Sequence, residues 1–247
     1  MKIAWFSAGV TSAVACKLAV ENFEDVQLFY IETGSHHPDN MRFLQDCEVW
    51  YGRKIEVVQS KKYSSVSDLI LTRRFINGPH GALCTTELKK EKRIRLNREL
   101  QPEAHILGYD NGEKERARLF TLRNPDSVFL YPLIEFNLSK NECAGIVQLI
   151  GIRLPEMYKL GYEHNNCLGC VKGGQGYWNK IRVDFIEVFN QRAAEEREVG
   201  ATCIKGVFLD ELDPNAGYGT KEVMPDCGIF CQYDFADLIT SPTPTTP

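Results

Sequence analysis

The beginning of this chain constrains its fold most, because a short apolar run meets a loop of small residues and then a helical pattern. Residues 2–6, KIAWF, have the length and composition of a buried strand. Residues 7–12, SAGVTS, form the loop, and residues 13–23, AVACKLAVENF, continue with helical spacing. A helix that starts directly after such a loop presents backbone N–H groups to an anion. The chain therefore opens with a predicted phosphate loop, Ser7 to Ser12.

Strand and helix patterns continue to alternate after this loop. Residues 26–34 (VQLFYIETG) and 55–60 (IEVVQS) are predicted strands, and residues 40–52 between them form a helical pattern that Gly52 ends. Residues 105–110 (HILGYD) predict a further strand, and a further apolar stretch covers 128–136. This order predicts an α/β fold, a parallel sheet with helices on both faces and ligands beyond the carboxyl ends of its strands.

The second half of the chain is predicted to be mainly helical. Ser139 and Glu142 fit a capping box at the start of a helix over 139–152, and residues 184–200 form an amphipathic helix. Residues 153–182, rich in Gly, Asn and aromatics, are predicted to be a structured loop. The expected domains are a nucleotide-binding α/β domain over 1–135, a helical, cysteine-containing extension packed on it over 136–240, and a disordered tail over 241–247.

Composition excludes several classes of protein. The net charge of −4 argues against coating nucleic acid through bulk charge, although a local basic groove remains open for the run of Lys and Arg at 89–95. With 43% hydrophobic residues and no apolar run of roughly 20 residues, we expect no membrane span and a cytoplasmic location. Nine cysteines without an export signal favour metal or redox chemistry over a disulfide framework.

Three cysteines stand out from the others. Cys167 and Cys170 form the motif CLGC, and Cys84 precedes a Thr-Thr pair. Two thiolates at this spacing can bind one metal or cluster edge, and a distant third can complete that face. Cys84, Cys167 and Cys170 are therefore the predicted ligands of an iron–sulfur cluster, with a zinc site and free thiols as alternatives. The cysteines at 16, 47, 143 and 203 lie in apolar contexts and are predicted to be core residues.

Four segments together resemble the adenine nucleotide α-hydrolase (PP-loop) superfamily, specifically its phosphoadenosine phosphosulfate (PAPS) reductase-like branch. They are FSAGVTSAVACKLA at 6–19, IETGSHHPDNMRFLQDCEVWYGRKIEVV at 31–58, CTTELKK at 84–90 and LGYDNGEKERARL at 107–119. The stretch NNCLGCVKGGQGYWNKIR at 165–182 is similar to the cysteine loop of reductase-like proteins of bacteria and their phages. The resemblance spans roughly residues 2–190 and implies a HUP-like α/β fold.

The resemblance also implies roles for individual residues. The family loop, S-G-G-x-D-S, matches at Ser7, Gly9 and Ser12, whereas Thr11 stands where ATP-using members have Asp, a departure that sulfonucleotide reductases share. The implied nucleotide-binding residues are Ser7, Ala8, Gly9, Val10, Thr11, Ser12, Glu32, Thr33, Gly34 and Gly108. Glu113 and Arg116 match a segment near the phosphates and are candidate catalytic residues. Cys227 resembles the catalytic cysteine of the reductases, and with Cys231 it is also a candidate fourth cluster ligand.

Two enzyme functions follow from the resemblance. In the preferred one, ATP adenylates an acceptor and a [4Fe–4S] cluster with one open iron supplies sulfur. In the alternative, a sulfonucleotide (PAPS or APS) reductase, Cys227 attacks the sulfur of the substrate. A zinc-stapled nucleotide- or nucleic-acid-binding module is the non-enzymatic alternative. The implied partners are ATP or another adenine nucleotide, Mg²⁺ where ATP is used, a nucleobase or nucleic-acid sulfur acceptor, and a second copy in a homodimer.

Overall fold

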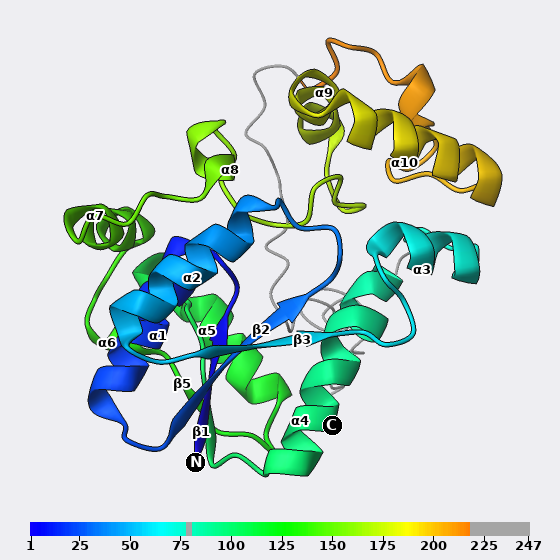
Figure 1. The fold of residues 1–247 in the computed structure, drawn as a ribbon. Coiled ribbons are helices and arrows are strands. Elements are labelled where there is room, and N and C mark those ends of the chain that lie inside the picture. Colours follow the sequence, from blue (N-terminus) through cyan, green and yellow to red (C-terminus); the bar gives the residue numbers. More distant parts are fainter. Residues whose placement is uncertain (78–80, 218–247) are drawn as a thin grey trace, which may run out of the picture.

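A parallel five-stranded sheet forms the centre of the molecule. In the computed structural model, which describes residues 1–77 and 81–217, the strand order is β3-β2-β1-β4-β5 and every neighbouring pair is parallel (Figure 1). The strands are β1 (Lys2–Phe6), β2 (Val26–Glu32), β3 (Ile55–Gln59), β4 (Ala104–Ile106) and β5 (Phe129–Leu130). The predicted α/β class is confirmed.

Helices connect the strands and follow the last one. They are α1 (Val10–Asn22), α2 (Asp39–Tyr51), α3 (Val66–Arg73), the π-helix η1 (Cys84–Lys90), α4 (Glu91–Leu100), the 3₁₀ turn η2 (Asn111–Glu113), α5 (Lys114–Arg123), α6 (Pro132–Glu135), α7 (Lys140–Leu149), α8 (Glu156–Lys159), α9 (Gln175–Asp184), α10 (Ile186–Val199) and the 3₁₀ turn η3 (Leu209–Glu211). No helix in the described part of the chain is long and apolar enough to cross a membrane.

Alternating side chains of β1 build a core on each face of the sheet. Ala4 and Phe6 point into a cluster with α1, α2 and α7, whereas Ile3 and Trp5 point into a cluster with α4 and α5. All four of these residues are buried. The central strand is thus covered on both sides, as its nearly continuous apolar sequence predicts.

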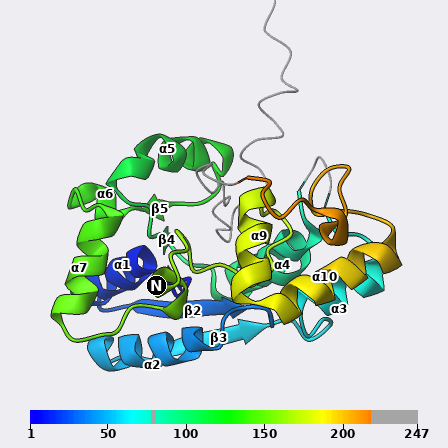
Figure 2. The same cartoon turned by 90° about the horizontal axis from the view of Figure 1, so that it is seen from above.

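A third hydrophobic cluster joins α3, α9, α10 and η1 beside the sheet (Figure 2). Tyr177 and Trp178 are 1% and 0% exposed in this cluster, so they are core residues. The prediction of a loop throughout 153–182 was wrong for α8 and α9. The glycines before α9 favoured a loop in the sequence, although Tyr177, Trp178 and Ile181 have the spacing of a helix face. This face of α9 is buried in the cluster.

Local signals for helix ends are borne out. Ser139 and Glu142 form the predicted capping box, with a 2.7 Å bond from Ser139 N to the Glu142 carboxylate. Gly52 ends α2 in the left-handed conformation, with φ of 64°. The apolar stretch at 128–136 gives only a two-residue strand, because Pro132 begins α6. The predicted tail at 241–247 lies outside the described residues.

Phe43 on α2 gives a test of the core on the α1 face. Its side chain is 0% exposed and stacks on Phe6 with ring centroids 6.0 Å apart. Phe43→Ala should lower the free energy of unfolding by about 3–5 kcal/mol, because it leaves a cavity. Val49→Ala on the same helix, where Val49 is 85% exposed, should change it by less than about 0.5 kcal/mol. Urea denaturation of both variants would measure this difference, and equal losses would contradict the packing described.

Candidate active site

The loop between β1 and α1 is held in shape by Ser12. The Ser12 hydroxyl donates to Gly9 O at 2.9 Å and accepts from Ser7 N and Ser7 Oγ, both at 3.0 Å. Ala8 has φ of 59°, a left-handed conformation that turns the chain into the helix. Among the described residues no side chain caps the first turn of α1 or places an acid there. The first N–H groups of α1 are therefore available to a ligand that carries negative charge.

Gly108, directly beyond β4, packs against the start of α1. A Cβ atom at this position would lie 2.8 Å from both Ser12 N and Ser12 Cα. Contact this close with a helix backbone is available only to glycine. Gly108 thus sets the distance between the β4 end of the sheet and the phosphate loop.

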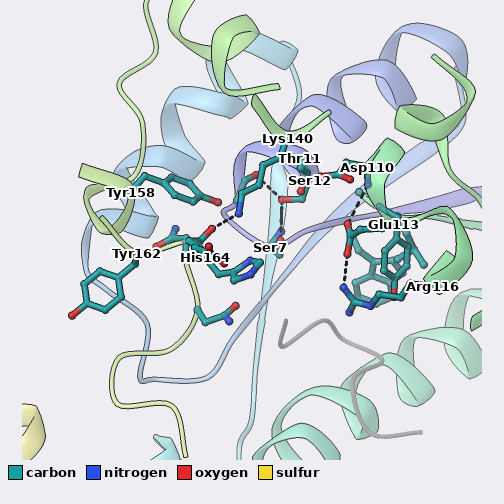
Figure 3. Close-up of a pocket in the computed structure, with 18 of the residues that line it drawn as sticks. Ser7, Thr11, Ser12, Asp110, Glu113, Arg116, Lys140, Tyr158, Tyr162 and His164 are labelled. Carbon is teal, nitrogen blue, oxygen red and sulfur yellow. Dashed lines mark hydrogen bonds and ion pairs between the residues drawn. The ribbon is translucent and has the colours of Figure 1, made fainter. Parts of the chain in front are cut away.

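A cavity of about 570 Å³ lies above this loop. Figure 3 shows the phosphate loop between two groups of side chains, one from the segment after β4 and one from α7, α8 and the segment after α8. The lining residues are Trp5, Ser7, Gly9, Thr11, Ser12, Leu107, Gly108, Tyr109, Asp110, Glu113, Arg116, Lys140, Asn141, Tyr158, Tyr162, Glu163, His164, Asn165 and Asn166. The volume is of the size expected for a small-molecule site at the carboxyl edge of a parallel sheet.

Arg116 and Glu113 lie together on one side of the cavity. Arg116 donates to Glu113 at 2.5 Å, and its guanidinium lies 4.8 Å from the centre of the Tyr109 ring. Glu113 also accepts from Asp110 N in a capping box. Glu113 therefore orients the guanidinium, which is suited to a bidentate contact with phosphate.

The opposite side of the cavity comes from residues that the sequence did not indicate as a site. Lys140 starts α7, donates to Glu163 O and lies 5.4 Å from the Tyr158 ring centre. The Tyr158 hydroxyl lies close to the phosphate loop, at 3.2 Å from where a Cβ on Gly9 would stand. Together with Arg116, Lys140 places positive charge on both sides of the phosphate loop (Figure 3).

The segment that carries Tyr158 is fastened to α2 by contacts with Asp39 and Arg42. Asp39 and Arg42 form two hydrogen bonds of 2.9 and 2.6 Å. Arg42 donates further to Arg153 O and Leu154 O, and Asp39 accepts from Glu156 N at 2.9 Å. These contacts satisfy backbone groups just before and at the start of α8 and so place Tyr158 over the cavity.

Glu32, Thr33 and Gly34 do not line the cavity. The Glu32 carboxylate accepts from Gly34 N at 2.7 Å and from Tyr30 Oη at 3.1 Å, and it lies 3.0 Å from His36 Nδ1. Burial alone would raise the pKa of Glu32, but the contacts with His36, Gly34 and Tyr30 lower it to about 2. A Cβ at Gly34, whose φ is 68°, would overlap Ser64 O. The turn after β2 therefore has a structural explanation, and its role in nucleotide binding stays a prediction.

The cysteine loop begins where the cavity wall ends. Asn165 and Asn166 line the cavity, and Cys167 follows them with its Sγ 3.1 Å from Thr33 Oγ1. Tyr177 Oη stands between the two turns of this loop, 2.9 Å from Cys170 N and 3.3 Å from Cys167 O. The CLGC segment is thus fixed between β2, α9 and the cavity.

The three predicted cluster ligands are only partly brought together. Three thiols are the right donors for iron or zinc, and Cys84 and Cys170 share one hydrophobic cluster. However, residues 1–77 and 81–217 contain no group of three His, Cys, Asp or Glu side chains close enough to hold a metal ion. The metal centre stays a prediction. Cys227, the other catalytic candidate, lies outside the described residues.

Gly108 offers a test of the loop contact. Gly108→Ala should lower the affinity for ATP or pyrophosphate at least about tenfold, because the new Cβ displaces the start of α1. Gly145→Ala is a matched control, since a Cβ added to Gly145 in α7 would meet no described atom within 4 Å. Calorimetric titration of both variants would measure the effect. Unchanged affinity in Gly108→Ala would contradict the contact.

Glu32 gives a pH-dependent prediction. Its folded pKa of about 2 lies below its ordinary value of 4.5, so its contribution is complete above pH 4.5 and is lost as pH falls toward 2. The stability difference between the native protein and Glu32→Gln should therefore shrink by about 2 kcal/mol from pH 5 to pH 3. Urea denaturation across this range would measure it. A difference that is constant with pH would show that Glu32 is not held as a carboxylate by these contacts.

The solved structures that are similar to this chain include a reductase and a tRNA thiolase. A PAPS reductase from Candida auris, solved as a phosphate complex, is 17% identical, with a TM-score of 0.50 over 67% of this chain and 80% of that chain. The U34-tRNA thiolase NcsA from Methanococcus maripaludis, solved with its [4Fe-4S] cluster, is 16% identical, with a TM-score of 0.45 over 81% of this chain and 70% of that chain. No curated protein sequence matches this chain.

The similarity to the reductase structure shows only that the two chains share a fold. A family model also matches this chain, over residues 2–173, which include the phosphate loop, Arg116 and the CLGC segment. The family is described as the phosphoadenosine phosphosulfate reductase domain. The chain belongs to this family.

Proposed function

We propose that this protein is an enzyme that binds ATP in the cavity above Ser7–Ser12, adenylates an acceptor and replaces the AMP with sulfur. The observation that carries the proposal is that one segment of the chain joins the cavity wall to the cysteine loop. Residues 162–166 form the wall of the cavity, and the first thiol of CLGC follows at Cys167. A nucleotide site and a thiol group are therefore parts of one structure, which suits chemistry that uses both.

The cavity residues suit binding of a polyphosphate. The N-terminus of α1 supplies uncapped N–H groups, while Lys140 and Arg116 supply positive charge from opposite sides. These groups would stabilise the charge that develops when an acceptor oxygen attacks the α-phosphorus and pyrophosphate leaves. Glu113 would keep Arg116 in place. Mg²⁺ entering with ATP would be held chiefly by phosphate oxygens and water.

Sulfur delivery is the second half of the proposal. A sulfur nucleophile displaces AMP from the activated acceptor, and the acceptor oxygen leaves with the AMP. Cys167 directly follows the cavity-lining residue Asn166, Cys170 lies three positions further on, and both are 7% exposed. A [4Fe–4S] cluster on Cys84, Cys167 and Cys170 would supply sulfide chemistry when bound. The proposed acceptor class is a nucleobase carbonyl, free or in a nucleic acid.

A second candidate function is supported by the family match. The family model that matches this chain is the PAPS reductase domain, so a sulfonucleotide is the natural alternative to ATP as the substrate. In that reaction the Cys227 thiolate attacks the sulfur of the substrate, and a second thiol then releases sulfite. Thr11 at the usual Asp position of the phosphate loop is compatible with this alternative, because a hydroxyl is a poorer Mg²⁺ ligand than a carboxylate.

Two product assays separate these functions. Anaerobically purified protein should release pyrophosphate from ATP in the presence of nucleosides or short RNA, and Cys227→Ser should retain this activity. Lys140→Ala should reduce it at least about tenfold through loss of one charge on the phosphates. Ion chromatography for pyrophosphate and for sulfite would follow both reactions in parallel.

The outcomes of these assays lead to different conclusions. Sulfite release from PAPS that Cys227→Ser abolishes, without pyrophosphate release from ATP, would replace the proposal by the reductase. Binding of nucleotide with neither product, together with stoichiometric zinc, would favour the non-enzymatic module. Lys159→Ala serves as a control, since Lys159 pairs with Glu156 and does not line the cavity.

A further inference from the structure

Asn165 connects the cysteine loop to the phosphate loop. Its side-chain nitrogen donates one 2.7 Å hydrogen bond to Ala8 O and another to Asn40 Oδ1 at the same distance. Both partners are oxygen atoms, so the amide must present its nitrogen to them. Asn165 is 5% and Asn40 1% exposed, so these bonds form away from bulk water, where they are strong and costly to lose.

Ala8 is the residue of the phosphate loop that most needs such support. Its φ of 59° is in the left-handed region, where a residue with a Cβ atom is strained. The S-G-G-x-D-S pattern has glycine at this position, and glycine adopts the conformation without that strain. Here the strain is opposed from outside the loop, by the amide that holds Ala8 O.

The orientation of Asn40 is fixed by a carboxylate. Asn40 Nδ2 donates to Tyr30 Oη at 3.3 Å, and Tyr30 Oη donates to Glu32 Oε2 at 3.1 Å. An ionised carboxylate only accepts, which fixes the direction of both bonds. Asn40 must therefore present its Oδ1 to Asn165.

We propose that Asn165 is a positioning residue for the nucleotide phosphates, which holds Ala8 in its left-handed conformation and so keeps the loop shaped for an anion. The proposal rests on the function proposed above. Asn165 lies two residues before Cys167, so the same side chain places the cysteine loop relative to the phosphates. In this chain the hydrogen bond from Asn165 to Ala8 O stabilises the left-handed conformation that glycine adopts at this position of the family pattern.

A rescue experiment tests this role with ATP and inorganic pyrophosphate as probes. Asn165→Ala should weaken the binding of both about tenfold, as expected for a buried hydrogen bond to the loop. Adding Ala8→Gly should recover at least about threefold of that loss, because glycine removes the strain that Asn165 opposes. The affinity of Ala8→Gly alone is the reference with which the double variant is compared. Isothermal titration calorimetry gives the affinities, and scanning calorimetry reports folding.

The matched control is Asn22→Ala, since Asn22 is exposed at the other end of α1, where its side chain donates to Leu18 O of the same helix. A native protein that binds neither ATP nor pyrophosphate would refute the proposed function. Native binding with no loss in Asn165→Ala, or a loss that Ala8→Gly does not recover, would refute the role of Asn165. If Asn165→Ala does not fold, Asn165→Asp keeps the shape without the donor, and unchanged pyrophosphate affinity in it would equally overturn the role.

Discussion

The contact of three separate segments with the phosphate loop determines how this site is built. Gly108 lies against Ser12, Asn165 holds Ala8 O, and Tyr158 lies near Gly9. Each segment comes from a different part of the chain, so the shape of the loop depends on the sheet, on α8 and on the cysteine loop together. The cost of a left-handed alanine and an uncapped helix start is then offset by packing, as is common at functional sites.

Much of the sheet and its first loop could be predicted because their signals are local. The apolar run of β1, the small residues of the loop and the helical spacing of α1 lie within about 20 residues. The capping box of Ser139 and the end of α2 at Gly52 are equally local. The predicted residues Ser7, Gly9, Thr11, Ser12, Gly108, Glu113 and Arg116 indeed line one cavity. Ala8 and Val10 are buried in the same loop.

The other wall of the cavity could not be predicted because it depends on tertiary contacts. Asn165 is 157 positions from Ala8, and its place two residues before Cys167 does not indicate that it contacts the phosphate loop. Tyr158 reaches the site through the Asp39–Arg42 pair, which lies on α2. Trp178 lies in a glycine-rich stretch for which the sequence predicts a loop, yet it is part of a hydrophobic core. In each case, contacts with residues far away in the sequence determine where the side chain lies.

The proposed chemistry requires a nucleotide whose phosphates lie on the loop and whose α-phosphate lies near the cysteine loop. A crystal structure with a non-hydrolysable ATP analogue measures this directly. We predict phosphate oxygens within hydrogen-bond distance of the first N–H groups of α1, with Lys140 and Arg116 on either side and the bond from Asn165 to Ala8 O retained. An analogue bound elsewhere, or phosphates directed away from Ser7–Ser12, would contradict the proposed site.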